Sequence, residues 1–323
     1  MKWIALALAL GSVGCRAQAG SISFESGAAA HGEGGAAPHD APIEAGSGGA
    51  RDIEAPIEAA AEGCAAEAVT LEELHSGRVR SGRALSLSGL VASSQKFLVS
   101  EAKSGSCLWG AFAAGAGRAG AGSGIFLVSF GATHADGEPC APGADGLPDD
   151  LRPGDALDVE GTLDAHVPAA CEGVVAAEQL RIDAACPARR GARGTPPQPD
   201  VIEPALAARL ASGKEEALLR DWAGALVALE GVSARRDGDD GDAVFPFGVI
   251  ELEETPLEVH SKLYYFDLSE GGPRSAAKTP RFSYPSAFER VVGLVFLDYC
   301  RWSLAPRDRC RDLVPASEDC ARR

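Results

Sequence analysis

Short stretches in which apolar and polar residues alternate recur along the chain from residue 84 onward. Alternation with a period of two is typical of β-strands, because successive side chains of a strand point to opposite faces. The pattern predicts strands at residues 84–91, 96–100, 107–112, 125–130, 156–163, 178–183, 226–232, 248–252, 257–267, 290–296 and 302–307. Glycines interrupt four of them, at Gly89, Gly161, Gly231 and Gly293, where we expect bulges or bends. The chain is therefore predicted to be mainly β.

The predicted helices are few and short. Thr70 and Glu73 have the spacing of a capping box, which opens a helix. Two more helices are predicted at residues 203–210, with Pro204 in the first turn, and at residues 214–222. Each half of the chain thus repeats one order: helix, glycine-bent strand, a hairpin-like pair, a second glycine-bent strand and a short final strand.

Five short, bent strands in each half are what a small, highly curved barrel requires. In this pattern both halves resemble OB-fold domains. The residues that carry the resemblance are 85–91 and 153–161 in the first half, and 226–232, 291–296 and 302–304 in the second. The resemblance implies two tandem OB-like β-barrels, within residues 69–186 and 214–314. A pair of β-sandwich domains stays open as the alternative fold.

The first 15 residues have the layout of an export signal: one lysine, an apolar run, then small residues that end at Cys15. The apolar run is too short to span a bilayer as a helix. The ending Ser12–Cys15 resembles a bacterial lipobox, which implies that Cys15 is lipidated and becomes the mature N-terminus. The alternative is cleavage at the A-x-A pattern Ala17–Ala19, which would release a soluble exported protein.

Composition divides the rest of the chain. Residues 16–62 are mostly Gly, Ala, Ser, Pro and Glu, with too little apolar surface to offset the entropy of folding, so we expect a disordered tether. A segment rich in Pro, Gly and Arg follows the first set of strands. The predicted organisation is a signal peptide at 1–15, the tether at 16–62, an OB-like domain at 63–187, a linker at 188–200 and a second OB-like domain at 201–323.

The chain has nine cysteines, and Cys15 is either lipidated or removed by cleavage under the two predictions for the N-terminus. Without Cys15 eight remain, and an even number in an oxidising compartment predicts up to four disulfides. The eight candidates are Cys64, Cys107, Cys140, Cys171, Cys186, Cys300, Cys310 and Cys320. Five of them precede residue 190 and three follow it, so at least one bridge joins the halves if all of them pair. Two free buried thiols are the alternative, and the pairing stays open.

The net charge of −16, from 30 basic and 46 acidic residues, disfavours a general nucleic-acid binder because such a surface repels phosphate backbones. The G-x-G-x-x-G pattern at Gly115–Gly120 leads into a strand rather than a helix, so we interpret it as a flexible hairpin loop and not a nucleotide site. The S-x-x-K pattern at Ser93–Lys96 lacks the companion motifs of penicilloyl enzymes. No catalytic set of residues can be assembled from the sequence.

Four carboxylates lie between two predicted strands, at Asp237, Asp239, Asp240 and Asp242. Calcium binds oxygen ligands in acidic, glycine-containing loops of this kind, although the spacing is not that of an EF-hand. Calcium is therefore the one candidate cofactor, and a solvated acidic turn is the alternative.

A second candidate site combines rings and cations near the end of the chain. Tyr264 and Tyr265 precede a loop at residues 271–283 that has no acidic residue. The cations of the loop are Arg274, Lys278 and Arg281. OB-folds bind extended polymers by stacking rings on them and by placing cations against their charges, so a groove for a polyanion or glycan is predicted here. Ordinary core aromatics beside a solvated loop are the alternative.

Together these features predict a non-catalytic binding or scaffolding lipoprotein of the cell envelope. Its expected partners are the membrane, through the lipid anchor, and an envelope protein or glycan, whereas nucleic acid is disfavoured as a partner. Two other hypotheses remain: a nucleic-acid-binding OB-fold module, and a calcium-dependent exported enzyme.

Overall fold

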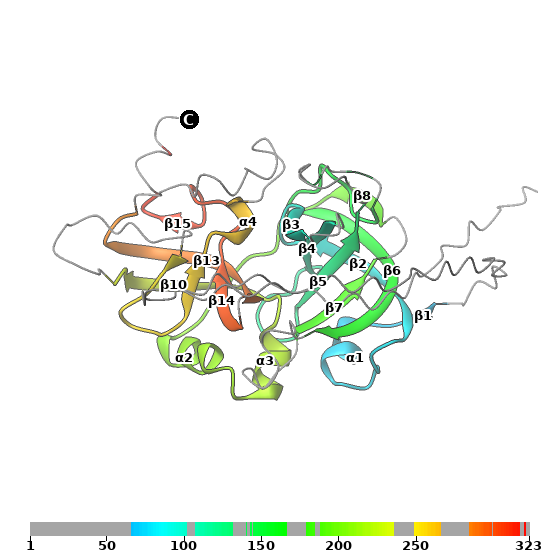
Figure 1. The fold of residues 1–323 in the computed structure, drawn as a ribbon, viewed down its shortest axis with the longest axis horizontal. Coiled ribbons are helices and arrows are strands. Elements are labelled where there is room, and N and C mark those ends of the chain that lie inside the picture. The colour runs from blue at the N-terminus through cyan, green and yellow to red at the C-terminus, as the bar shows by residue number, and fades with distance from the viewer. Residues whose placement is uncertain are drawn as a thin grey trace, which may run out of the picture.

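The computed structural model describes residues 66–101, 107–131, 140, 143, 145–166, 179–184, 188–235, 249–265, 284–298, 300–316 and 320. Figure 1 shows two β-rich halves side by side, with the first half in cyan and green and the second in yellow and orange. Strands dominate both halves, and the helices of the described residues are short. The prediction of a mainly β protein is confirmed.

Five strands of the first half close into a barrel. They are β2 (Ala84–Ala92), β4 (Cys107–Gly115), β5 (Gly124–Phe130), β7 (Gln179–Asp183) and β6 (Asp155–His166). Each strand pairs with the next in that order, and β6 pairs with β2 to close the ring. The pair β5 and β7 is parallel and the others are antiparallel. This closed barrel is the one expected for the first half.

Two glycines allow the strands of the barrel to bend. Gly89 has a φ of +69°, and the pairing of β2 with β6 shifts register beside it, which is the predicted bulge. A Cβ atom on Gly161 would lie 2.2 Å from the carbonyl oxygen of Asp183. From Thr162 onward β6 pairs with β7, so Gly161 lies where the strand curves across two neighbours.

Shorter elements surround the barrel. The helix α1 (Leu71–His75) begins at the predicted capping box, in which the side chain of Thr70 accepts from the backbone N–H of Glu73. The strand β1 (Glu67–Ala68) pairs with β2, and β3 (Phe97–Glu101) pairs with β4. An additional strand, β8 (Arg189–Arg193), pairs with β6 inside the segment predicted to be a linker, so this part of the segment belongs to the first sheet.

The second half contains a second sheet with a similar order. Its strands run β11 (Val249–Ile250), β12 (Glu258–His260), β14 (Arg301–Ala305), β13 (Ala287–Asp298), β10 (Leu226–Ser233) and β9 (Asp200–Val201), and β15 (Leu313–Val314) pairs with β13. The pair β12 and β14 is parallel, as β5 and β7 are in the first half. Among the described residues, one antiparallel bridge between Ala234 and Leu252 joins the chain just after β10 to the chain just after β11.

Three helices belong to the second half. The helix α2 (Pro204–Ser212) has Pro204 in its first turn and ends at Gly213 in a left-handed conformation, and α3 (Glu216–Trp222) follows. The strand predicted at residues 257–267 is confirmed at β12 (Glu258–His260) and wrong at α4 (Lys262–Tyr265), where the chain is helical. Consecutive apolar residues suit a buried helical turn as well as a strand, so their pattern does not separate the two.

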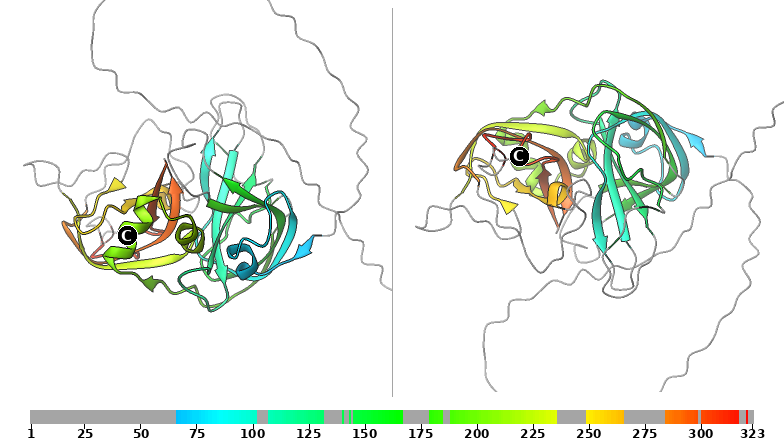
Figure 2. Two further views of the ribbon diagram at one scale, coloured as in Figure 1. Left: turned by 90° about the horizontal axis from the view of Figure 1, so that it is seen from below. Right: turned by 90° about the horizontal axis from the view of Figure 1, so that it is seen from above.

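Strand alternation divides the apolar side chains between separate cores. In β4 and β5, the side chains of one face fill the barrel and those of the other face contact the second half. In β10 and β13, one face packs into the core of the second half and the other face contacts the first half. The shared layer contains Phe97, Leu108, Phe112, Phe126 and Val128 from the first half, and Leu226, Ala228, Leu263, Val292, Leu294, Phe296 and Ala305 from the second. Figure 2 shows the cyan strands of the first half turned toward the orange strands of the second.

The aromatic rings of this shared layer are in close contact. The rings of Phe112 and Phe126 stack with centroids 4.8 Å apart, and Phe296 meets them edge-on at 5.4 and 5.3 Å. Such stacked and edge-on pairs are favourable beyond the area that they bury. The two halves therefore pack through a buried aromatic layer.

The prediction of disulfides is confirmed. Cys107 is bonded to Cys140, and Cys310 to Cys320. Cys300 is also disulfide-bonded.

Candidate functional site: a charged groove between the halves

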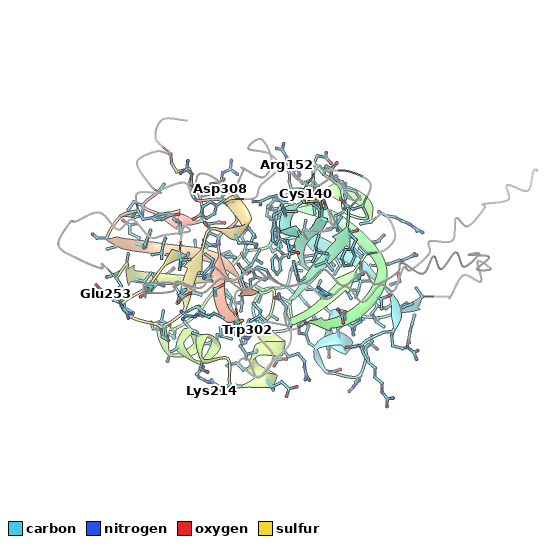
Figure 3. The ribbon with its side chains drawn as sticks, viewed as in Figure 1. Cys140, Arg152, Lys214, Glu253, Trp302 and Asp308 are labelled. Carbon is cyan, nitrogen blue, oxygen red and sulfur yellow. A yellow bond between two sulfur atoms is a disulfide. The ribbon has the colours of Figure 1, made fainter. Side chains whose placement is uncertain are left out.

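A groove of about 780 Å³ lies between the two halves. Figure 3 labels Arg152 on the first half and Asp308 on the second, and both line this groove. The first half and the segment that leaves it contribute Gln95, Lys96, Asp149, Asp150, Leu151, Arg152, Pro153, Arg193 and Pro196, and the second half contributes Arg307, Asp308, Arg311 and Asp312. Charged side chains dominate both walls.

One wall is held in place by a buried lysine. Lys96 is 1% exposed, and its Nζ donates to Asp145 Oδ2 at 2.5 Å, Asp149 Oδ1 at 2.6 Å and the carbonyl oxygen of Leu147 at 3.0 Å. The same ammonium lies 5.1 Å from the centroid of the Trp109 ring. All three N–H groups of the lysine are therefore used, as a buried ammonium requires. The S-x-x-K lysine anchors the segment 145–149 to the barrel.

The same segment carries a buried carboxyl group. Burial raises the pKa of Asp145, and the hydrogen bond from Lys96 opposes that shift without cancelling it. The disulfide between Cys107 and Cys140 adds a covalent link between β4 and the chain just before this segment. The lysine and the disulfide together fix the position of this wall.

A second buried carboxylate organises the arginines of the first half. Asp155 accepts from Arg193 Nε at 2.7 Å, and Arg190 Nη2 lies 2.8 Å from its other oxygen. The backbone N–H of Arg152 also donates to Asp155. Burial raises the pKa of Asp155, but these hydrogen bonds and the two guanidinium charges outweigh it, so the pKa lies below its usual value. The other terminal nitrogen of Arg190, Nη1, donates to Asp150 at 2.7 Å.

The opposite wall belongs to the segment after β14. Arg307 holds Asp312 through both carboxylate oxygens, with Nη2 at 2.7 Å and Nε at 3.0 Å. Two polar contacts cross to the first half: Gln95 Nε2 donates to the carbonyl oxygen of Arg307 at 2.6 Å, and Arg307 Nη1 lies 3.5 Å from the carbonyl oxygen of Ser93. This wall is therefore tied to the first half.

Two guanidinium groups in the groove remain open to solvent. The side chain of Arg152 is exposed and has no hydrogen bond or ion pair with the described residues. The side chain of Arg311 is 87% exposed, and its one described ion pair, with Asp308, is long at 3.6 Å. Each carboxylate of the groove, in contrast, is within hydrogen-bond distance of an N–H group of the chain. The groove therefore offers cationic donors to a ligand.

The predicted aromatic and basic site is only partly described. Tyr264 is buried, and its hydroxyl lies 2.5 Å from that of Tyr284, so its ring belongs to the core and is not exposed for stacking. Burial raises the pKa of Tyr264, and raises that of Tyr284 to about 12. The side chain of Tyr265 and the cations Arg274, Lys278 and Arg281 lie outside the described residues.

The other predicted sites also fall outside the described part of the chain. These are the acidic loop with Asp237, Asp239, Asp240 and Asp242, the lipidation candidate Cys15, and the cysteines Cys64, Cys171 and Cys186. Among the residues that the structure does describe, no three metal-binding side chains cluster. Within the same residues, no helix is long and apolar enough to cross a bilayer.

The glycine-rich pattern at Gly115–Gly120 forms the predicted hairpin loop, between β4 and β5, but the loop packs against the second half. The N–H of Gly122 donates to the carbonyl oxygen of Asp221 at 2.6 Å. A Cβ atom on Gly124 would lie 2.1 Å from the carbonyl oxygen of Gly224. Close backbone approach between the halves therefore requires a glycine at position 124, whereas Gly117, Gly120 and Gly122 have positive φ angles, which favour glycine.

Comparison of the chain with family models, with curated proteins and with solved structures gave no match. The function is therefore inferred from the geometry of the groove.

Proposed function

We propose that this protein is a non-catalytic binding lipoprotein of the cell envelope, and that it holds an envelope glycan or protein in the groove between its halves. The observation that carries the proposal is a charged groove built jointly by two halves that share a buried core. Ligand sites are common at such boundaries, because two packed units can present groups from both sides. Export and anchoring rest on the signal-like residues 1–15 and on Cys15.

The buried face of the first barrel favours the groove over the usual OB-type surface. OB-folds bind polymers on the outer face of their second and third strands, which correspond to β4 and β5 here. The outward side chains of these strands, including Phe112 and Phe126, lie under the second half, with Phe112 fully buried. A nucleic acid could not stack on these rings without separating the halves. The burial of this face, added to the acidic net charge, disfavours the nucleic-acid hypothesis.

We infer that the second half is a second OB-like barrel. In support, it repeats the pairing order and the parallel strand pair of the first half, and the bridge between Ala234 and Leu252 brings the chain after β10 beside the chain after β11. Gly231, with a φ of +60°, and Gly293, on which a Cβ atom would lie 2.7 Å from Leu304 Cγ, occupy the positions of Gly89 and Gly161. The calcium-dependent enzyme remains a hypothesis that no described residue favours.

The proposed function is tested by thermal unfolding of the full mature chain with soluble cell-wall glycan fragments and, separately, with a single-stranded oligonucleotide. A ligand at one hundred times its dissociation constant adds about 2.7 kcal/mol of stability, which raises the melting temperature by several degrees. We expect this shift with the glycan fragments and none with the oligonucleotide.

Two tryptophan variants locate the site. Pro196→Trp places a large ring in the groove, whereas Gln198→Trp places the same ring at an exposed position of the same segment that does not line the groove. The glycan shift should disappear in the first variant and persist in the second. A shift that survives Pro196→Trp, or a shift produced only by the oligonucleotide, contradicts the proposed function.

A further inference from the structure

We propose that the groove recognises an anionic oxygen group of its ligand, a carboxylate or a phosphate, through the guanidinium groups of Arg152 and Arg311. The inference rests on the proposed function, because it names the ligand chemistry of the same groove. The inference is based on which charged side chains of the groove are already bonded within the protein and which are not.

The carboxylates of the groove are engaged within the protein. Asp149 accepts from Lys96, Asp150 from Arg190, and Asp312 from Arg307. Asp308 accepts the backbone N–H of Cys310 at 2.7 Å. A cationic ligand would therefore compete with bonds that already exist, so the groove is poorly suited to bind a cation.

Most cations of the groove are engaged in the same way. Lys96 uses all three of its N–H groups, Arg193 is bound to Asp155, and Arg307 is bound to Asp312. These residues position the walls. Arg152 makes no side-chain hydrogen bond or ion pair with the described residues, and Arg311 makes only a long one. These two guanidinium groups can therefore donate to a ligand without breaking a short contact within the protein.

The two guanidinium groups come from opposite walls. Arg152 belongs to the turn before β6 in the first half, and Arg311 to the segment after β14 in the second. A guanidinium group donates two parallel N–H bonds, which match the oxygen pairs of a carboxylate or phosphate. A ligand with anionic groups can thus contact both halves.

The charge of the lining supports the same conclusion. The lining has five cationic side chains and four carboxylates, and the buried carboxylates of Asp145 and Asp155 are bonded to two of those cations, so the groove is close to neutral in a chain whose net charge is −16. An anion repelled by most of the surface therefore meets two open guanidinium groups in a nearly neutral setting here, and its binding should weaken as ionic strength rises.

The test is isothermal titration of the full mature chain with succinate and, separately, with inorganic phosphate. The variants are Arg152→Gln, Arg311→Gln and the double variant, and Arg80→Gln is the matched control. Arg80 is exposed, has no ion pair with the described residues and does not line the groove, and its replacement changes the net charge equally.

We expect one or both anions to bind the wild-type chain, with an affinity that falls about tenfold or more in each groove variant, as loss of a charge-assisted hydrogen bond implies. Arg80→Gln should bind as the wild type does. Succinate binding alone would identify the group as a carboxylate, phosphate binding alone as a phosphate, and each supports the inference if Arg152 and Arg311 are required.

Two results would overturn the inference: no binding of either anion by the wild-type chain, or equal binding by the double variant and the Arg80→Gln control. Such a failure is separate from a failure of the proposed function. A glycan-induced thermal shift that Pro196→Trp abolishes would still show that the groove binds a ligand, by contacts other than these two arginines.

Discussion

At the scale of single residues, buried charges with several partners fix the walls of the groove. Asp155 is the strongest example, since its carboxylate holds two arginines and one backbone N–H. Breaking a buried ion pair is costly because the remaining charge loses its partner. The cost is smaller here, since the side chains of Arg190 and Arg193 are 30% and 49% exposed and water can solvate their charges.

The replacement Asp155→Asn should lower the free energy of unfolding by about 2 kcal/mol at pH 7. The pKa of Asp155 is lowered in the folded state. Its contribution is therefore fully present above the ordinary aspartate pKa of about 3.9 and is lost as the pH falls through the lower folded value.

Urea denaturation of both chains between pH 7 and pH 3 measures this effect. The difference in unfolding free energy should stay constant down to about pH 5 and shrink below about pH 4. A difference that grows on acidification would mean that the ion pairs of Asp155 do not stabilise the fold.

At the scale of elements, the β4–β5 loop is a docking contact between the halves. His75, at the end of α1, supports the same contact: one ring nitrogen lies 2.8 Å from the carbonyl oxygen of Gly124 and the other 2.8 Å from that of Arg220. Gly124 therefore lies between backbone atoms of both halves and has no room for a side chain.

We expect Gly124→Ala to destabilise the chain by about 3 kcal/mol, since the added methyl group forces the two backbones apart. Gly194→Ala is the matched control, because a Cβ atom there would be 3.9 Å from its nearest neighbour. The control should change stability by less than about 0.5 kcal/mol. Equal melting temperatures for the two variants would show that the close approach at Gly124 does not matter.

Several elements could be predicted from local patterns. Alternation located the strands of the barrel, and the glycines at positions 89 and 161 marked its bends, because the conformation of a bent strand depends on its own residues. The capping box at Thr70 and the helix with Pro204 in its first turn were predicted correctly for the same reason.

Elements that depend on distant partners could not be predicted in this way. The residues of β8 are classed as exposed and lack an apolar pattern, and the strand forms through backbone pairing with β6. The shared core does leave a signal in the sequence: β4 is apolar on both faces, which indicates that both of its faces are buried. A search for alternating apolar and polar residues overlooks this signal. The groove combines residues 95–96, 149–153 and 307–312, and local patterns do not show that these meet.

At the scale of the whole molecule, the aromatic layer makes the two halves depend on each other. Phe296 of the second half contacts Phe97, Phe112 and Phe126 of the first. Neither half can lose its fold without exposing this layer to water. We therefore expect the halves to unfold together.

Phe296→Ala tests this dependence and should cost about 3 to 5 kcal/mol. The buried tryptophans Trp109 and Trp302 report on the first and second half respectively. In reporter chains that keep one of them and replace the other tryptophans with Phe, Phe296→Ala should lower both unfolding midpoints. If the midpoint reported by Trp109 stays unchanged, the halves unfold independently and the shared layer does not couple them.

Amide hydrogen exchange of the full chain, measured with and without saturating cell-wall glycan fragments, tests most directly whether both halves build one binding groove. We expect the ligand to slow exchange at residues 149–153 and 307–312 in the same experiment, because these segments form opposite walls of one groove. Slowing in one segment only, or protection confined to other regions, would contradict a binding site built by both halves.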